Sequence, residues 1–254
     1  MKHHLHPTLH EQQVDGTLVP CYQPIIDMRE GKIKAIEVLA RKRMPHGQIC
    51  EIDALSQMLQ HPRTAIEVTR IMMARALDDI LTLPYQRIPL AVAINFTASH
   101  FDSERFANEC VEFHTRVTKR NVQLIIELTE HECLHIHSDK FEVMHYLQQQ
   151  GIRLALDDFG TGYSNLIYLN RFKFDCLKID KEFTHNVQQS KMLPPIMSMM
   201  IALGQEQGME IVAEGVETAR QSQILRRSGI YLQQGFHFCR PMPVENLSHL
   251  LDSN

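Results

Sequence analysis

Short apolar runs of strand length recur along the whole chain and alternate with segments of helical periodicity. There are eight such runs, each rich in Val, Ile and Leu: Cys21–Asp27, Ile33–Arg41, Leu90–Phe96, Val122–Leu128, Ile152–Asp158, Phe174–Asp180, Glu210–Val216 and Tyr231–Phe238. Helices with one polar face are predicted in the gaps, over Thr64–Leu83, Ser103–Thr118, Asp139–Gln150, Lys191–Gln207 and Thr218–Ser228. Strands that alternate with helices pair in parallel, so the pattern predicts an α/β fold.

The number of strands and the length of the chain together favour a closed barrel. The chain has 254 residues, and no Pro-, Gly- or Ser-rich linker divides it. The first connection, residues 28–32, is so short that it can join only antiparallel neighbours. We therefore predict a modified TIM (β/α)8-type barrel whose first strand is antiparallel. Residues 19–254 form this barrel, and residues 1–18 are a short N-terminal lead.

Charge and cysteine usage exclude several classes of protein. The net charge is -4 and the pI is about 6.4, which gives no basic surface for duplex nucleic acid. The six cysteines form no C-x-x-C pair and lie mostly in apolar runs, which is typical of reduced thiols. No apolar signal segment or membrane-spanning run is present in the sequence. We expect a cytoplasmic protein without membrane insertion.

Each predicted strand is apolar until its C-terminal end, where it turns polar. In a barrel these ends share one face, and catalytic groups lie there. A single polar residue at such a position is as often an ordinary loop junction. The whole set instead favours a site, and it comprises Glu37, Asn95, Glu127, Asp157, Asp158, Lys178, Asp180, Glu214, Glu217 and Gln234.

Seven of these groups are carboxylates, and Lys178 is the one lysine among them. Like charges that converge in a low-dielectric site cannot all ionise without compensation, so the pattern requires cations. Oxygen ligands favour Mg²⁺ or Mn²⁺ over Zn²⁺. A pair of such metals suits in-line attack on a phosphodiester.

Several longer segments identify a known family. They read YQPIID at Tyr22–Asp27, EVLAR at Glu37–Arg41, INFTASHF at Ile94–Phe101, ELTE at Glu127–Glu130, LALDDFGTGYSNL at Leu154–Leu166, LKID at Leu177–Asp180, VAEGVET at Val212–Thr218 and QQGFHFCRPMP at Gln233–Pro243. With these segments in this order, the chain resembles the EAL phosphodiesterase family from about Cys21 to Leu250. The segment DDFGTGYSNL is highly specific, whereas a three-letter E-x-L alone carries almost no information.

The resemblance implies that the chain hydrolyses cyclic di-GMP to linear pGpG by two-metal in-line attack of water. It implies two Mg²⁺ or Mn²⁺ ions per site and a homodimer. Ca²⁺ is larger and tolerates irregular coordination, so we expect it to bind and inhibit. The metal ligands that it implies are Glu37, Asn95, Glu127 and Asp157, with Asp158 shared between the two ions.

Other roles follow from the same resemblance. Lys178 orients the attacking water and Glu214 is a base or water ligand, so the implied catalytic set is Lys178, Glu214, Glu37 and Asp157. The implied substrate-binding residues are Gln23, Leu39, Arg41, Asp180 and Gln234, with Arg41 as a phosphate clamp. Glu217 anchors the loop that follows Asp158, and that loop includes Gly160, Thr161 and Gly162.

The chain departs from the family pattern in places. The signature triplet reads Glu37-Val38-Leu39 rather than Glu-Ala-Leu, and residues 44–64 match worst, so contacts to guanine in that stretch stay open. The alternative function is a non-catalytic EAL module that binds cyclic di-GMP or a protein partner as a sensor or adaptor. Such modules usually lose a ligand or the DDFG segment, and this chain keeps both.

Two further patterns have more than one interpretation. His131, Glu132 and His135 spell H-E-x-x-H, the signature of zinc proteases, but the motif lies directly behind a strand without a clear long helix. We interpret it as a loop or helix start. The methionines at 192, 197, 199, 200 and 209 could form an adaptable partner surface, and we expect them to fill the core instead.

Overall fold

The computed structural model describes residues 17–52, 59–83, 90–133, 138–161, 169, 172–187 and 193–252. Within these residues the strands are β1 (Thr17–Asp27), β2 (Lys32–Arg43), β3 (Ile49–Cys50), β4 (Leu90–Phe96), β5 (Val122–Thr129), β6 (Arg153–Phe159), β7 (Cys176–Ile179), β8 (Glu210–Ala213) and β9 (Leu232–Gln233). The helices are α2 (Pro62–Thr82), α3 (Glu104–Thr118), α4 (Glu130–Cys133), α5 (Ser138–Gln149), α7 (Lys181–Asn186), α8 (Pro195–Glu206), α9 (Ala219–Arg227) and α10 (Val244–Asp252), with a 3-10 turn η1 at Ala98–Asp102.

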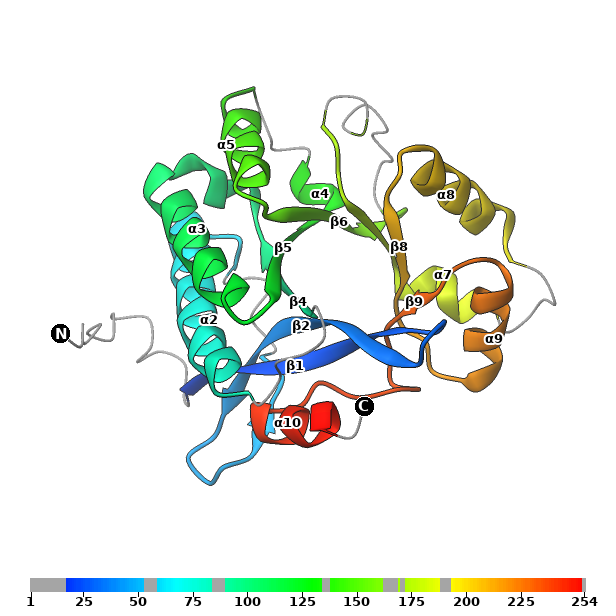
Figure 1. Ribbon diagram of the computed structural model, residues 1–254, viewed down its shortest axis with the longest axis horizontal. Helices are drawn as coiled ribbons and strands as arrows, with labels where there is room; N and C mark the ends of the chain where they lie inside the picture. Colours follow the sequence, from blue (N-terminus) through cyan, green and yellow to red (C-terminus); the bar gives the residue numbers. More distant parts are fainter. Residues whose placement is uncertain are drawn as a thin grey trace.

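The strands close into a barrel surrounded by helices (Figure 1). The order is β1-β9-β8-β7-β6-β5-β4-β2-β3, and β1 also pairs with β2, so the ring closes and β3 extends it at one edge. Around the ring, pairing is parallel from β2 through β4, β5, β6, β7 and β8 to β9, while β1 runs antiparallel to both β2 and β9. The edge strand β3 pairs antiparallel with β2. The predicted fold class, including the reversed first strand, is confirmed.

A tight turn explains why the first strand runs backwards. The amide of Gly31 donates to the carbonyl of Asp27 at 2.7 Å, and Gly31 has a φ of +70°, a conformation that glycine adopts without steric cost. The turn sets a register in which Gln23 lies opposite Glu37. Two predicted site residues are therefore neighbours by strand pairing.

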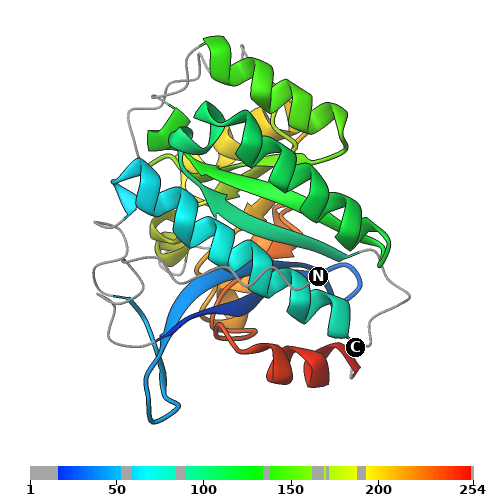
Figure 2. The same cartoon turned by 90° about the vertical axis from the view of Figure 1, so that its left-hand side faces the viewer.

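The barrel interior is lined by small apolar side chains. Its inner cluster contains Ala35, Ala91, Ala93, Ala155 and Val212, among others. Figure 2 shows helices lying against the outside of the strands. A larger apolar cluster fills the layer between the two. Because successive strand residues face opposite sides, each strand contributes alternately to these two layers. The small inner residues leave a cavity of about 30 Å³ within the barrel.

The predicted helices are present, with ends shifted by a few residues. The exception is Lys191–Gln207, whose first residues lie outside the described ones and whose helix, α8, begins at Pro195. The short helix α7 and the C-terminal α10 were not predicted. No described helix has the length and apolarity to cross a bilayer. None of the six cysteines takes part in a disulfide.

A buried histidine joins the end of β4 to α2. His100 is 2% exposed and stacks on Phe96 with ring centroids 4.7 Å apart. The amide of Thr97 donates to its Nδ1 at 2.9 Å, so the ring proton of the neutral form lies on Nε2, which contacts Thr69 Oγ1 at 3.0 Å. Burial lowers the pKa of His100 to about 4.

We predict that His100 makes the fold sensitive to acid. The unfolded chain has a histidine pKa near 6.5, so between pH 6.5 and 4 the unfolded state binds a proton that the folded state excludes. Its stabilising contribution is complete above pH 6.5 and falls by about 3 kcal/mol as the pH drops to 4. Urea denaturation of the wild type and of His100→Gln at several pH values measures this loss of stability. The same pH dependence of the unfolding free energy in both proteins would contradict the prediction.

Candidate active site

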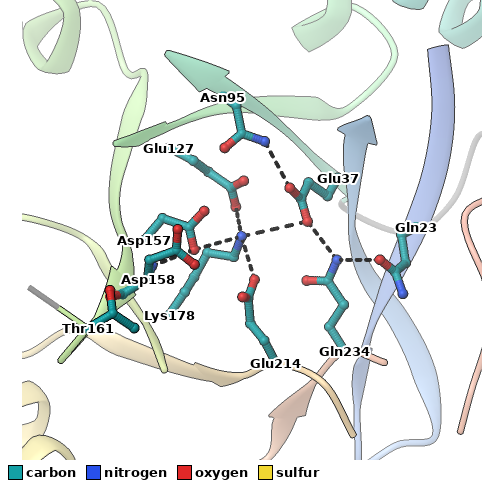
Figure 3. A network of polar contacts seen from close by, with 10 residues as sticks. All are labelled: Gln23, Glu37, Asn95, Glu127, Asp157, Asp158, Thr161, Lys178, Glu214 and Gln234. Atoms are coloured by element: carbon teal, nitrogen blue, oxygen red, sulfur yellow. Dashed lines mark hydrogen bonds and ion pairs between the residues drawn. The ribbon is translucent and has the colours of Figure 1, made fainter. Parts of the chain in front are cut away.

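Most of the polar residues predicted from the strand ends meet at one mouth of the barrel (Figure 3). The alternation of each strand brings them there, because each lies two residues beyond an inward-facing apolar residue. Thus Glu37 follows Ala35, Glu127 follows Ile125 and Lys178 follows Cys176. The same spacing places Asn95 after Ala93, Asp157 after Ala155, Glu214 after Val212 and Gln234 after Leu232.

The ammonium of Lys178 lies at the centre of the cluster, 1% exposed. Its Nζ is 2.7 Å from Glu214 Oε1, 3.0 Å from Glu127 Oε1 and 3.1 Å from Asp157 Oδ1. Glu37 Oε2 lies slightly farther away, at 3.6 Å. Four carboxylates from four strand ends thus surround one lysine, and their negative charge exceeds its positive charge.

Amide side chains fix the orientation of Glu37. Asn95 Nδ2 donates to Glu37 Oε1 at 2.9 Å, and Gln234 Nε2 donates to Glu37 Oε2 at 2.7 Å. Gln234 Nε2 also lies 3.3 Å from Gln23 Oε1, and Gln23 Nε2 donates to the carbonyl of Cys239 at 3.2 Å. Glu37 therefore accepts hydrogen bonds on both oxygens, from groups on different strands.

The electrostatics of the cluster are strongly perturbed. Burial raises the pKa of Glu214 to about 8, with Asp157 and Glu37 adding to the rise and Lys178 opposing it. Burial also raises the pKa of Glu127 well above its usual value. The pKa of Glu37 is lowered, because Lys178 and the two amides outweigh its burial. Such a site favours added positive charge.

The backbone after Asp157 is held in an unusual conformation. Asp158 has a φ of +51°, a left-handed conformation that is uncommon for a residue other than glycine. Burial and the charges of Asp157 and Asp180 raise the pKa of Asp158 to about 6. Thr161 closes the turn, since its amide and its Oγ1 both donate to the carbonyl of Asp158, at 3.3 and 2.9 Å.

The loop after Asp158 packs tightly at Gly160. This residue has a φ of +98°, and a Cβ here would lie 2.2 Å from Met200 Cε and 2.8 Å from the ring of Phe183. Glycine is therefore required on both conformational and steric grounds. Gly162, which we expected in the same loop, lies outside the described residues.

A pocket of about 420 Å³ opens over the carboxylates. Predicted residues that line it include Gln23, Leu39, Arg41, Glu217 and Gln234. Arg41 donates through Nη1 to the carbonyl of Ala40 at 2.9 Å and lies 3.5 Å from Glu51 through Nη2. Glu217 Oε1 is 3.5 Å from His185 Nε2.

Asp180 has a structural contact in addition to its position at the mouth. Its Oδ1 accepts from the amide of Glu182 at 2.7 Å, which makes it the N-cap of α7. Sequence reasoning missed Lys181 and His185, which line the pocket from the same helix. The segment LKIDK was the available signal, but a helix as short as α7 has no periodicity to reveal which residues face the mouth.

The cluster fits divalent metal ions. Single carboxylate oxygens of Glu37, Glu127 and Asp157 lie within 4.8 Å of one another, and so do those of Asp157, Asp158 and Glu214. Glu127 Oε2 is buried with no hydrogen-bond partner among the described residues. An oxygen-rich set with an unpartnered buried carboxylate oxygen suits hard cations such as Mg²⁺ or Mn²⁺.

The H-E-x-x-H motif gives no support to the zinc-protease interpretation in the residues that the structure describes. Glu132 Oε2 accepts from the amide of Ala98 at 2.6 Å, which ties α4 to the end of β4. The helix α4 ends at Cys133, and His135 lies outside the described residues.

The fold and the mouth together define a barrel protein with a cluster of carboxylates at one mouth, and comparison assigns its family. The chain belongs to the EAL domain family, whose model matches residues 8–241. The probable cyclic di-GMP phosphodiesterase PdeG of Escherichia coli K12 is 34% identical over 242 residues, which cover 93% of this chain and 47% of PdeG. The chain thus spans about half the length of this relative.

Solved structures show the same fold. PaMucR phosphodiesterase in complex with c-di-GMP aligns with a TM-score of 0.80 and 28% identity, over 94% of this chain and 98% of that one. Klebsiella pneumoniae BlrP1, in a complex with manganese and cyclic di-GMP, aligns with a TM-score of 0.72 and 25% identity, over 89% of this chain and 56% of that one.

We predict that Lys178 stabilises the metal-free fold. Replacing it with Met leaves four buried carboxylates without their cation, so we expect Lys178→Met to lose roughly 3 kcal/mol of unfolding free energy in EDTA. Part of the loss should return on addition of Mn²⁺, which supplies the missing charge. Urea denaturation measures both effects. Exposed Lys119, replaced in the same way, is the control, and equal stabilities of the two variants in EDTA would contradict the prediction.

Proposed function

We propose that the chain is a divalent-metal-dependent phosphodiesterase that hydrolyses cyclic di-GMP to linear pGpG. The single observation that carries the proposal is the buried lysine among four strand-end carboxylates beneath an open pocket. Relatives and neighbours support it, since PdeG is named a probable cyclic di-GMP phosphodiesterase and the PaMucR structure contains c-di-GMP. The intact DDFG segment also favours a catalytic member of the family over a binding module.

The metal ligands in this proposal are the cluster oxygens. Glu37, Asn95, Glu127 and Asp157 would hold the ions, and Asp158 would serve both. Asn95 already donates its amide nitrogen to Glu37, which leaves its amide oxygen as the ligand atom. When bound, Mg²⁺ or Mn²⁺ supplies the positive charge that stabilises the charge developing on the phosphate oxygens.

The chain's own residues position the water and the substrate. Lys178 donates a hydrogen bond to the attacking water. Glu214, which contacts Lys178 at 2.7 Å, accepts a proton from that water. Gln23, Leu39 and Arg41 line the substrate side of the pocket. Asp180 and Gln234 complete the polar surround, the latter by holding Glu37. The water oxygen forms a bond to phosphorus as the bond to the 3′ oxygen breaks, and the 3′ oxygen takes up a proton from solvent, giving pGpG.

Glu217 belongs to the same proposal as the anchor of the loop that begins at Gly160. Its side chain lines the pocket beside Asp158 and contacts His185 on α7. Thr161 closes the first turn of that loop on the Asp158 carbonyl. An anchor at Glu217 would restrict the movement of Asp158 and so preserve the geometry of the metal site.

We expect cyclic di-GMP to be opened to pGpG when Mg²⁺ or Mn²⁺ is present, with EDTA abolishing turnover and Ca²⁺ inhibiting it. Ca²⁺ accepts irregular coordination and does not enforce in-line geometry. Glu37→Ala and Asp157→Ala should each lose about a hundredfold or more in kcat, because metal positioning is lost. Chromatography of the products with each metal measures these effects.

Three further variants serve as comparisons in that assay. His131→Ala and His135→Ala should remain active, whereas Glu217→Ala should lose turnover while every metal ligand is still present. The reverse pattern, with the histidine variants inactive and the acidic ones active, would establish zinc chemistry instead. Tight binding of cyclic di-GMP without any hydrolysis would establish the non-catalytic module.

We also propose that the chain is a homodimer in a reducing compartment such as the cytoplasm, with α8 in the interface. Support for the dimer comes from Ile196 and Met199, which are 44% and 67% exposed on one face of α8. Met197 and Met200 of the same helix are buried as expected for core methionines, whereas the expectation of core filling is wrong for Met199. Exposed apolar side chains side by side are typical of contact surfaces.

Charged substitutions at Ile196 and Met199 on α8 should therefore separate the subunits. The double variant Ile196→Lys and Met199→Lys should sediment as a monomer where the wild type sediments as a dimer, since it places charge in an apolar contact. Tyr231→Lys, at an exposed aromatic residue away from α8, is the control. A dimer that persists in the double variant would exclude α8 from the interface.

A further inference from the structure

The rim of the mouth carries two cations that face the pocket from opposite sides. Arg41 lies near the C-terminal end of β2. Lys181 is the first residue of α7, and only Asp180, the N-cap of that helix, separates it from β7. In the ring of strands, β1, β9 and β8 separate β2 from β7 on one side, and β4, β5 and β6 separate them on the other. The two cations are therefore diametrically opposed, with the carboxylate cluster between them.

The backbone of Lys181 is held firmly in place. Gly215, with a φ of +63°, lies directly against it, because a Cβ there would be 2.3 Å from Lys181 Cβ and 2.9 Å from Lys181 Cα. Asp180 caps the same turn through the amide of Glu182. The base of the lysine side chain is thus fixed next to Glu214, which precedes the glycine.

The charged end of Lys181 is available to a ligand. Lys181 is exposed, and no carboxylate of the described residues lies within ion-pair distance of its ammonium. Glu217, an acid that lines the same pocket, contacts His185 at 3.5 Å instead. The guanidinium of Arg41, by comparison, already contacts Ala40 and Glu51.

A cyclic dinucleotide needs a cation at this position. It carries two phosphodiesters, and only the one under attack can lie over the metal cluster. The second keeps its negative charge in a pocket whose lining includes Glu37, Asp157, Asp158, Glu214 and Glu217. Without a positive partner, this phosphate would be repelled by the acidic mouth.

We propose that Lys181 binds the phosphodiester that is not attacked, and so determines specificity for cyclic dinucleotides over simple phosphodiesters. The inference rests on the function proposed above. It predicts that Lys181 contributes to substrate binding and leaves the chemical step unchanged, because no ion pair joins its ammonium to the described carboxylates of the cluster. Arg41 then holds the substrate from the opposite rim.

The test measures binding and turnover separately with Lys181→Ala, Lys181→Arg and the control Lys119→Ala. Lys181→Ala should raise the Kd for cyclic di-GMP in Ca²⁺, and KM in Mn²⁺, by roughly five- to tenfold, with kcat changed less than twofold. Lys181→Arg should recover most of the affinity, and Lys119→Ala should match the wild type. The affinity of the wild type should also fall more steeply with salt than that of Lys181→Ala.

A substrate with a single phosphate completes the design. Hydrolysis of bis(p-nitrophenyl) phosphate should be the same in wild type and Lys181→Ala, since no second phosphate is present. Equal cyclic di-GMP affinity in both proteins, no recovery by Lys181→Arg, or an equal loss with the small substrate would overturn the inference. Wild-type protein that binds cyclic di-GMP but never hydrolyses it would overturn the proposed function alone. A failure to bind would overturn both.

Discussion

The contact of Lys178 with four carboxylates is the interaction on which the rest of the site depends. Its ammonium is almost completely removed from water, and the surrounding acids come from β2, β5, β6 and the end of β8. A buried lysine without such partners would lose its proton, and buried acids without a cation would gain one. Charge balance thus couples strands that are far apart in the sequence, and closure of the barrel is what brings them together.

The barrel divides each strand into a structural part and a chemical part. Alanines such as Ala35, Ala91 and Ala155 fill the lower interior without polar atoms, and they leave a small cavity below Lys178 and Glu127. Two to four residues farther along, the same faces carry acids and amides. A one-residue shift of any strand would turn its functional side chain outward, so the register specifies the site as well as the fold.

Much of this arrangement could be predicted from the sequence, for definite physical reasons. Strand positions follow from apolar runs, and the reversed strand follows from a connection too short for a parallel crossover. The meeting of Glu37, Glu127, Asp157 and Lys178 follows from the geometry of a closed barrel. The position of Lys181 could not be predicted in this way, because it depends on how closely α7 approaches Gly215. Likewise, spacing alone could not separate exposed Met199 from buried Met200, since both lie on one short helix.

The same helix connects the surface of the molecule to the metal site. Met200 on the buried face of α8 lies directly under Gly160, so the loop cannot move toward the helix without displacing that methionine. Asp158, two residues earlier, is already held in a left-handed conformation, which persists only when its surroundings fix it. A partner that packs on Ile196 and Met199 would immobilise α8 and thereby Met200. Through this packing, a partner on the surface of α8 would restrict the loop that follows Asp158 without touching the active-site pocket.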